Sequence, residues 1–338
     1  MVNDILNVKG LKVSYVTDAV TVHAVDDATF AIPRGAIVGL VGESGCGKTT
    51  VARALTRVMA KAARFEGGEA IFDGTDLLSL TDTEMNTLRW RDIAFIPQSA
   101  MNSLDPVYTI ESQLNEVLIQ RGGLDRRQAR ARAEELFDMV GIEPRRLRDY
   151  PHQFSGGMRQ RVAIALALAL EPKLIIADEP VTALDVIVQR QILDTLKALQ
   201  ARLGLSVILV THDISVVAYV CDRIVVMYAG RVAESGDTAT VLTAPFHPYT
   251  MGLYNAFPDL QSSQGLLTPI EGHPPDLSDP PPGCRFAPRC PFVQSRCRSG
   301  AVPLIDVGGG HFSNCLRADE AVDLRRDAER PETWAATA

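Results

Sequence analysis

The chain has 338 residues, 46% of them hydrophobic and 22% charged, and a formal net charge of −7 at pH 7. This composition is typical of a folded protein with room for one large domain and a smaller one. The acidic balance argues against a general nucleic-acid-binding protein. The start of the chain lacks the pattern of a signal peptide, and the longest apolar run, Val162 to Leu170, is far shorter than the ~20 residues of a membrane span. We therefore expect a soluble, cytosolic protein.

The pattern of apolar residues predicts strands that alternate with helices. Strands are expected within residues 4–40, at 69–78 around an Asp-Gly turn, at 173–178, at 205–211, and as a hairpin at 222–236. Helices are expected from Gly47–Lys48 onward and over 111–140, 156–170 and 186–204. This alternation predicts an α/β core with a largely parallel sheet, into which a helical block at about 100–165 is inserted.

The sequence changes in texture after about residue 250. PPDLSDPPPG, Pro274 to Gly283, contains too much proline for a regular helix or a central strand. We therefore expect a main domain over residues 1–250 and a C-terminal extension over residues 251–338.

GESGCGKT, Gly42 to Thr49, fits the phosphate-binding pattern G-x-x-x-x-G-K-[ST] between a predicted strand and a predicted helix. Its glycines let backbone N–H groups surround phosphate oxygens, and the start of the helix favours an anion. Lys48 is expected to reach the β- and γ-phosphates, and the Thr49 hydroxyl to ligate Mg²⁺. A chance match in a turn is the alternative, which the flanking elements disfavour. The predicted nucleotide-binding residues here are Gly42, Ser44, Gly45, Cys46, Gly47, Lys48, Thr49 and Thr50.

Two acidic residues, Asp178 and Glu179, end the apolar run LIIADEP. An aspartate there can hold Mg²⁺ directly or through water, and the neighbouring glutamate can polarise an attacking water. The alternative is a pair of solvated turn acids, which becomes less favoured once a phosphate loop precedes them.

FSGGMRQ, Phe154 to Gln160, resembles the LSGGQ signature of ABC ATPases, with Phe in place of Leu and Met in place of Gln. Serine and glycine at a helix start suit an anion, although a plain helix cap would look similar locally. The family's other marks occur in order. By resemblance they are an adenine-stacking aromatic, a Q-loop glutamine, a D-loop and a switch histidine, at Tyr15, Gln98, Ala183-Leu184-Asp185 and His212.

The resemblance covers about residues 4–250. It implies an α/β fold: an ABC-type P-loop NTPase core with an antiparallel β subdomain and an inserted helical subdomain, followed by a small irregular cysteine-rich extension. In this family two such domains meet head to tail around ATP. Ser155, Gly156 and Gly157 would then contact the partner's nucleotide, and Mg²⁺ would be held through Thr49, Gln98 and Asp178. The resemblance gives catalytic roles in ATP hydrolysis to Glu179, His212 and Gln98.

Further stretches resemble the ATPase subunits of dipeptide/oligopeptide and nickel importers: PQSAMNSLDP at Pro97–Pro106, HPYT at His247–Thr250, and the later GHPPDL. This resemblance implies a peripheral protein on the cytoplasmic face of the membrane that powers peptide import. Its partners would be two permease subunits, a second and non-identical ABC ATPase, and an extracytoplasmic peptide-binding protein, with no nucleic acid. Import of nickel chelates is an alternative, as is a non-transport ABC ATPase that associates with nucleic acid or ribosomes.

Four of the six cysteines, Cys284, Cys290, Cys297 and Cys315, are spaced C-x5-C-x6-C-x17-C near the end of the chain. In a reducing compartment they favour a metal site over disulfides. Structural zinc sites use closely spaced pairs, which this set lacks, whereas each iron of a [4Fe–4S] cluster takes one cysteine. The family resemblance also implies such a cluster. Zinc, and free or disulfide-bonded cysteines, remain alternatives, and the cluster's role can be structural or sensory.

Overall fold

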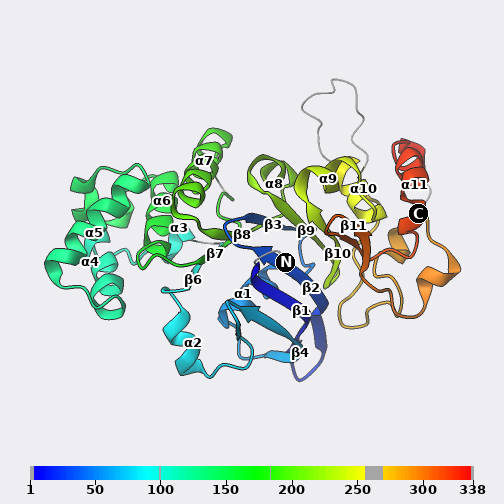
Figure 1. Cartoon of the computed structure of the whole chain (residues 1–338), viewed down its shortest axis with the longest axis horizontal. Coiled ribbons are helices and arrows are strands. Elements are labelled where there is room, and N and C mark those ends of the chain that lie inside the picture. The colour runs from blue at the N-terminus through cyan, green and yellow to red at the C-terminus, as the bar shows by residue number, and fades with distance from the viewer. Residues whose placement is uncertain (1–3, 99, 183, 256–268, 336–338) are drawn as a thin grey trace. The chain divides into compact units, whose positions relative to one another are not determined.

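The computed structural model describes residues 4–98, 100–182, 184–255 and 269–335 (Figure 1). The chain forms two compact units, each built from separate segments. Unit 1 contains the described residues of Met1–Ile5, Ile32–Ile37 and Ser79–Val210. Unit 2 contains those of Leu6–Ala31, Val38–Leu78 and Thr211–Ala338. The C-terminal extension therefore shares a unit with the phosphate loop.

The sheet strands of unit 1 are parallel and buried, as the sequence predicts. β6 (Ile93–Ile96) pairs with β7 (Leu174–Asp178), and β7 pairs with β8 (Ser206–Thr211). Every residue of β7 and β8 is buried, which explains their nearly continuous apolar sequences. Helices α6 (Gly156–Ala167) and α7 (Val186–Leu203) lie within the helices predicted at 156–170 and 186–204.

The helical block of unit 1 is more broken than its sequence pattern suggests. Its elements are α2 (Asp82–Leu88), α3 (Ala100–Ser103), α4 (Ile110–Asn115), the π-helical η1 (Glu116–Arg121), α5 (Arg126–Met139), η2 (Pro144–Arg148) and η3 (Pro151–Gln153). The helical pattern predicted over 111–140 is confirmed for most of this range, but it is divided near Gly123. Gly123 has a φ of 72°, and Asp125 begins a new helix by a capping box with Gln128.

One sheet of unit 2 is the predicted antiparallel β subdomain. It has four strands in the order β2-β1-β4-β5, with β2 at Thr21–Pro33, β1 at Asp4–Val16, β4 at Ala63–Phe72 and β5 at Thr75–Asp76. The β4–β5 hairpin turns at Asp73–Gly74, where Gly74 has a φ of 86°, so the Asp-Gly turn prediction is confirmed.

The other sheet strands of unit 2 carry the phosphate loop. β3 (Ile37–Val41) runs parallel to β9 (Arg223–Tyr228), which forms the predicted hairpin with β10 (Arg231–Asp237). The hairpin is extended by β12 (His311–Ser313) and β11 (Ile305–Gly308), both from the C-terminal extension. The extension is therefore more regular than expected, because its strands join the sheet that contains β3.

The remaining elements of unit 2 are short helices. They are α1 (Lys48–Thr56), α8 (Ile214–Val220), α9 (Thr238–Thr243), α10 (Pro248–Asn255), η4 (Ala287–Arg289), η5 (Ser295–Arg298), η6 (Ala318–Glu320), α11 (Ala321–Ala328) and α12 (Pro331–Ala335). Trp334 in α12 is 1% exposed, and a Cβ on Gly252 of α10 would lie 2.6 Å from its ring. The end of the described chain is therefore packed closely on α10.

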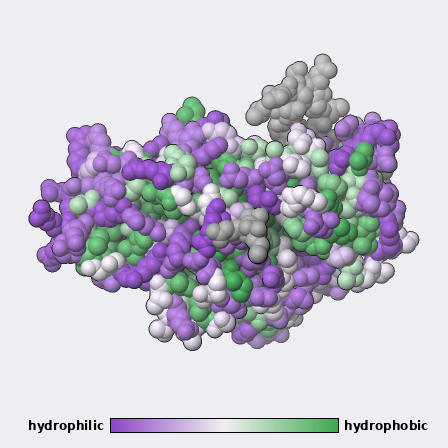
Figure 2. All heavy atoms as spheres, in the orientation of Figure 1, coloured by the Kyte–Doolittle hydropathy of each residue, from purple (hydrophilic) through white to green (hydrophobic). Residues whose placement is uncertain are grey.

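None of the described helices is both long and apolar enough to cross a membrane. Hydrophilic residues cover most of the face in view in Figure 2, with apolar side chains scattered between them.

Candidate functional site

The phosphate loop, Gly42–Gly47, joins the buried strand β3 to helix α1 within unit 2. Gly42, Gly45 and Gly47 have φ values of 149°, 80° and 104°, which side chains rarely allow. A Cβ on Gly42 would lie 2.1 Å from the Met227 carbonyl oxygen, and one on Gly47 would lie 2.4 Å from that of Ala24. The conformation of the loop therefore requires glycine at these positions.

Lys48 begins α1 and is 6% exposed. Its ammonium donates to the carbonyl oxygens of Gly42 at 2.7 Å and Glu43 at 2.9 Å, and it lies 3.7 Å from the Cys46 sulfur. Burial raises the pKa of the Cys46 thiol, an effect that the Lys48 charge opposes in part. A lysine held over the loop by carbonyl oxygens can exchange these partners for phosphate oxygens.

Two other predicted site residues belong to unit 2. The Tyr15 hydroxyl on β1 lies 3.3 Å from Oγ1 of Thr50, the third residue of α1. The structure therefore brings Tyr15 to the helix that follows the phosphate loop. His212 directly follows β8 and is exposed. The next residue, Asp213, caps helix α8, because its carboxylate accepts a hydrogen bond from the Ser215 N–H at 2.8 Å.

The acidic turn, Asp178–Thr182, lies at the end of β7 in unit 1. Asp178 is 1% exposed, and Glu179 has a φ of 49° with its N–H donating to the Val210 carbonyl oxygen at 2.8 Å. Oε2 of Glu179 accepts hydrogen bonds from Gln98 Nε2 at 2.8 Å and from Thr182 Oγ1 at 3.0 Å. Two of the predicted catalytic residues, Gln98 and Glu179, are thus in contact, and Thr182 is a further member that the sequence analysis missed.

The signature residues also lie in unit 1, at the start of α6. Ser155 caps this helix by accepting from the Met158 N–H at 3.4 Å, and Asp185 caps α7 by accepting from the Val188 N–H at 2.9 Å. A Cβ on Gly157 would lie 2.5 Å from Cγ1 of Val188. The two helix starts therefore pack closely, and Gly157 permits this contact. Ala183 of the predicted D-loop and Ser99 after Gln98 lie outside the described residues.

Glu43, a variable position of the phosphate loop, has partners that no motif revealed. Its N–H donates to the Tyr249 hydroxyl at 2.9 Å, and its carboxylate accepts from Arg289 Nη1 at 2.8 and 3.1 Å. Tyr249 belongs to HPYT, which served in the sequence only as a mark of subfamily. Arg289 precedes Cys290 and carried no sequence signal. Only the fold brings these residues to the loop.

All six cysteines lie within the described residues, and each is a free thiol. Burial raises the pKa of Cys284 and Cys290, and raises that of Cys315 to about 12. In each of the six pairs formed by Cys284, Cys290, Cys297 and Cys315, a negative charge on one sulfur raises the pKa of another. These mutual effects indicate that the four thiols, which come from separate loops, lie near one another, and we call them the cysteine cluster.

Three sulfurs of the cysteine cluster accept backbone hydrogen bonds that lower their pKa. The main donor in each case lies two residues further along the chain: Phe286 for Cys284, Phe292 for Cys290 and Arg317 for Cys315. The Arg317 N–H is 3.4 Å from its sulfur. Such donors stabilise a thiolate and tune an iron–sulfur cluster where one is bound.

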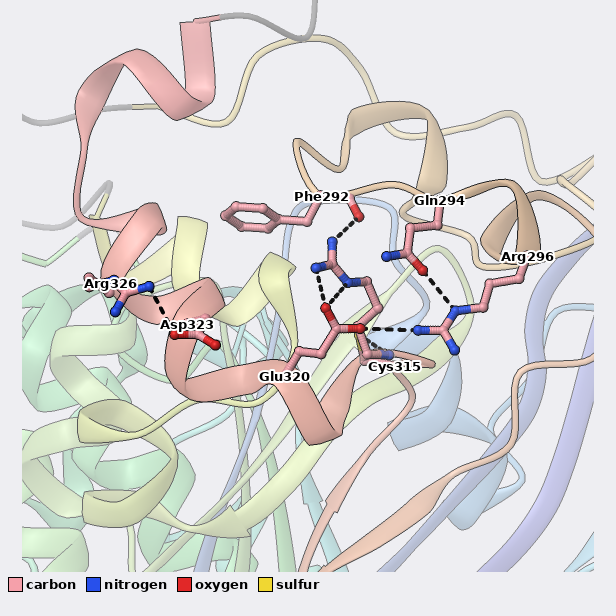
Figure 3. Close-up of polar contacts among 8 residues, drawn as sticks. Phe292, Gln294, Arg296, Cys315, Glu320, Asp323 and Arg326 are labelled. Atoms are coloured by element: carbon pink, nitrogen blue, oxygen red, sulfur yellow. Dashed lines mark hydrogen bonds and ion pairs between the residues drawn. The ribbon is translucent and has the colours of Figure 1, made fainter.

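Arg317 also ties two cysteine loops together. Its guanidinium donates to the Phe292 carbonyl oxygen at 2.8 Å and to the Glu320 carboxylate at 3.0 Å. The other oxygen of Glu320 pairs with Arg296 at 3.1 Å, as Figure 3 shows. The loop that carries Cys315 is thus fixed to the one that carries Cys290.

In the part of the chain that the structure describes, no three His, Cys, Asp or Glu side chains form a group that could hold a metal ion. This finding supports neither the zinc alternative nor the predicted [4Fe–4S] cluster, because each needs several of these side chains close together.

Comparison with known families gives two matches. Residues 25–182 match the family described as ABC transporter, and residues 233–297 match the oligopeptide/dipeptide transporter, C-terminal region. The second match includes three of the four clustered cysteines.

Two curated relatives align over nearly the whole chain. The dipeptide transport ATP-binding protein DppD of Bacillus subtilis is 46% identical over 325 residues, which cover 94% of this chain and 96% of the relative. The oligopeptide transport ATP-binding protein OppD of Salmonella typhimurium is 43% identical over 320 residues, which cover 94% and 95%.

Solved structures support the same fold. The ATP-binding cassette MJ0796, in a dimeric post-hydrolysis state bound to ADP and Pi, is 31% identical with a TM-score of 0.62, covering 69% of this chain and 98% of that one. CbiO1 from Clostridium perfringens is 28% identical with a TM-score of 0.61, covering 71% and 91%. The chain therefore belongs to the ABC transporter family of ATPases and has the cassette fold that the sequence predicts.

Proposed function

We propose that this ATPase powers the import of dipeptides or oligopeptides across the cytoplasmic membrane. The observation that carries the proposal is the match of residues 233–297 to the C-terminal region of oligopeptide/dipeptide transporters. The names of the relatives, which are 46% and 43% identical over 94% of the chain, support it. The ATPase motifs alone fit a nickel-chelate importer or a non-transport ATPase equally well, so the C-terminal match favours peptides.

The residues of unit 2 are proposed to bind the nucleotide. The backbone N–H groups of the phosphate loop would surround the phosphates, with Lys48 on the β- and γ-phosphates and Tyr15 stacked on adenine. The loop conformation, which requires Gly42 and Gly47, and the Tyr15–Thr50 contact at 3.3 Å support these roles. His212 is proposed to contact the γ-phosphate.

The residues of unit 1 are proposed to carry out hydrolysis. Glu179, oriented by hydrogen bonds from Gln98 and Thr182, would accept the proton of the attacking water. The carboxylate of Asp178 and the amide of Gln98 in unit 1, and the hydroxyl of Thr49 in unit 2, are oxygen ligands of the kind that Mg²⁺ prefers. Bound there, Mg²⁺ would neutralise charge on the phosphates. Ser155, Gly156, Gly157 and Asp185 are proposed to act on the nucleotide of a second cassette.

The proposed assembly contains two permease subunits, a second and non-identical ABC ATPase, and an extracytoplasmic peptide-binding protein. This chain would lie on the cytoplasmic face of the membrane as a peripheral subunit, and we propose no nucleic-acid partner. Chemical energy would reach the permeases through the closing and opening of the ATPase pair.

Co-purification followed by transport tests this function. The tagged chain should recover two membrane subunits and a second ATPase, and vesicles that contain this complex and its binding protein should accumulate labelled dipeptide or oligopeptide in an ATP-dependent way. Uptake of a nickel chelate without uptake of peptide would show that the transported substrate is a nickel chelate. Recovery with ribosomes or nucleic acid, and with no membrane subunit, would refute the transport function.

We also propose that Cys284, Cys290, Cys297 and Cys315 hold a [4Fe–4S] cluster as a structural tie. Their electrostatic coupling, wide sequence spacing and backbone hydrogen bonds to sulfur support this assignment. Bound iron would stabilise the thiolates of Cys284, Cys290 and Cys315, whose pKa burial raises. A structural tie suits the extension, because small modules with little core need such cross-links.

Anaerobic purification tests the cluster. We expect a brown protein with about four irons and four labile sulfides per chain, because each cubane iron takes one thiolate. Cys290→Ser should lower the iron content, whereas Cys221→Ser, at a buried cysteine outside the cluster, should leave it unchanged. A colourless protein that contains one zinc, or no metal, would overturn the assignment.

A further inference from the structure

The phosphate loop is held at Glu43 by residues that lie more than 200 positions later in the chain. Arg289, in the turn between Cys284 and Cys290, pairs with both carboxylate oxygens of Glu43 at 2.8 and 3.1 Å. The Tyr249 hydroxyl accepts the Glu43 N–H at 2.9 Å. The Glu43 carbonyl oxygen accepts from Lys48 at 2.9 Å, so the side chain and both backbone groups of this residue are fixed.

Burial and several hydrogen bonds hold the Arg289 side chain in one position. It is 6% exposed, and its guanidinium donates to the carbonyl oxygens of Ile270 at 3.0 Å and Glu271 at 2.9 Å. It also donates to the Tyr228 hydroxyl at 3.3 Å. Burial acts to lower the pKa of Arg289, but its contacts with Glu43 and Tyr228 raise the pKa above its usual value. The guanidinium is therefore charged and rigidly aimed at the loop.

Tyr249 is equally constrained. It is fully buried, and its ring lies 4.5 Å from that of Tyr228 and 5.4 Å from that of Phe286, the second residue after Cys284. Burial raises the pKa of Tyr249 well above its usual value, so the hydroxyl that meets Glu43 is neutral. An aromatic cluster thus joins the cysteine-bearing loop to the backbone of the phosphate loop.

We propose that Arg289 and Tyr249 are positioning residues for nucleotide binding: they hold the phosphate loop in the conformation that accepts ATP, and Arg289 neutralises Glu43 there. This inference rests on the proposed nucleotide site. A carboxylate in a loop that binds phosphates opposes binding by charge repulsion unless it is paired. The charged hydrogen bonds from Arg289 Nη1 to both carboxylate oxygens remove that repulsion and fix the loop at the same time. The C-terminal extension therefore contributes to ATP binding by holding the phosphate loop in place.

Binding of MgATP to the full-length chain, measured by calorimetry below the unfolding temperature of every variant, tests the inference. Arg289→Met should weaken ATP binding about tenfold, since it disorders the loop and leaves Glu43 charged. Adding Glu43→Gln to Arg289→Met should recover about threefold of that loss, because the repulsive charge is gone. Arg289→Lys should fall between the wild type and Arg289→Met. Arg296→Gln, in the same extension but paired with Glu320, is the matched control and should leave the affinity unchanged.

The outcomes are separable. If Lys48→Ala abolishes ATP binding but Arg289→Met binds within twofold of the wild type, the inference is overturned while the nucleotide site stands. A lower unfolding temperature with unchanged affinity has the same meaning, because a purely structural arginine would give that result. If Lys48→Ala binds ATP normally, the nucleotide site itself is wrong. Should Arg289→Met fail to fold, Tyr249→Phe, which removes one hydroxyl, must still weaken binding by about threefold.

Discussion

The phosphate loop and the acidic turn both follow buried strands, but they are held in different ways. The acidic turn is fixed by Val210, Gln98 and its own Thr182, all within unit 1. The phosphate loop is fixed by Tyr249 and Arg289, which lie 206 and 246 positions after Glu43. A short motif can therefore specify the chemistry of a loop while a distant extension specifies its conformation.

We therefore expect the two regions to control different quantities. Substitutions in the acidic turn should change the rate of hydrolysis, whereas substitutions in the contacts of the phosphate loop should change the affinity for ATP.

The largest effect is expected for Glu179→Gln. Loss of the proposed proton acceptor should lower the hydrolysis rate by about 10² to 10³-fold, because general-base catalysis contributes on that scale. The amide keeps the size of the side chain, so ATP should bind with an affinity within about threefold of the wild type. Phosphate release and calorimetry measure the two quantities. A variant that hydrolyses ATP normally would remove Glu179 from the mechanism.

A lower pH should destabilise the protein through His247, which contacts Tyr249 near the phosphate loop. Burial lowers the pKa of His247 from 6.5 to about 4, and its Nδ1 accepts the Tyr249 N–H at 3.0 Å. Between these values the unfolded chain binds a proton that the folded chain does not, so stability rises with pH. On going from pH 6.5 to 4, this group should cost on the order of 3 kcal/mol of unfolding free energy.

Urea denaturation across this pH range checks the prediction. His247→Gln, which cannot be protonated, should show a flatter dependence on pH than the wild type. Equal slopes for the two proteins would mean that His247 is not the titrating group.

Asp26→Asn should loosen a second attachment of the extension without touching the phosphate loop. Asp26 on β2 pairs with Arg231 at 2.7 Å and with the buried Arg285 at 2.5 Å. Burial acts to raise the pKa of Asp26, but the two arginines lower it below its usual value. Losing the carboxylate leaves Arg285 buried without its counter-charge, so the unfolding free energy should fall by about 2 kcal/mol.

For Asp26→Asn the affinity for ATP should stay within about twofold of the wild type. Denaturation and calorimetry on the same preparation test both expectations. An ATP affinity that falls as far as it does in Arg289→Met would show that general loosening of the extension, and not the Glu43 contact, sets the binding.

The smallest effect is expected for Arg296→Gln. Arg296 and Glu320 form a pair with 53% and 35% of their side chains exposed. Exposed pairs contribute little, so the unfolding free energy should stay within the scatter of replicate measurements on the wild type. A larger loss would mean that this pair supports the cysteine loops more than its exposure suggests.

Much of the site could be predicted because each motif is local. Gly42 to Thr49 and the acidic end of LIIAD carry their chemistry in consecutive residues. The contact between Gln98 and Glu179 follows from parallel pairing of β6 with β7, which places both strand ends at one edge.

The other parts of the fold and the site could not be predicted, because they depend on residues that are far apart in the sequence or on weak local patterns. Nothing in the sequence pairs Arg289 with Glu43, since neither residue carries a motif of its own in that role. The helical pattern over 111–140 did not show where one helix ends and the next begins, between Gly122 and Asp125. The strands β11 and β12 have four and three residues, too few to show an alternating pattern.

Steady-state ATP hydrolysis by Glu179→Gln and Arg289→Met, measured side by side with ATP binding, tests the central comparison most directly. We predict that Glu179→Gln loses about 10² to 10³-fold in rate at saturating ATP and keeps its affinity. Arg289→Met should lose about tenfold in affinity and keep a saturating rate within about threefold. If both variants lose rate alone, or both lose affinity alone, the distinction between the two regions is contradicted.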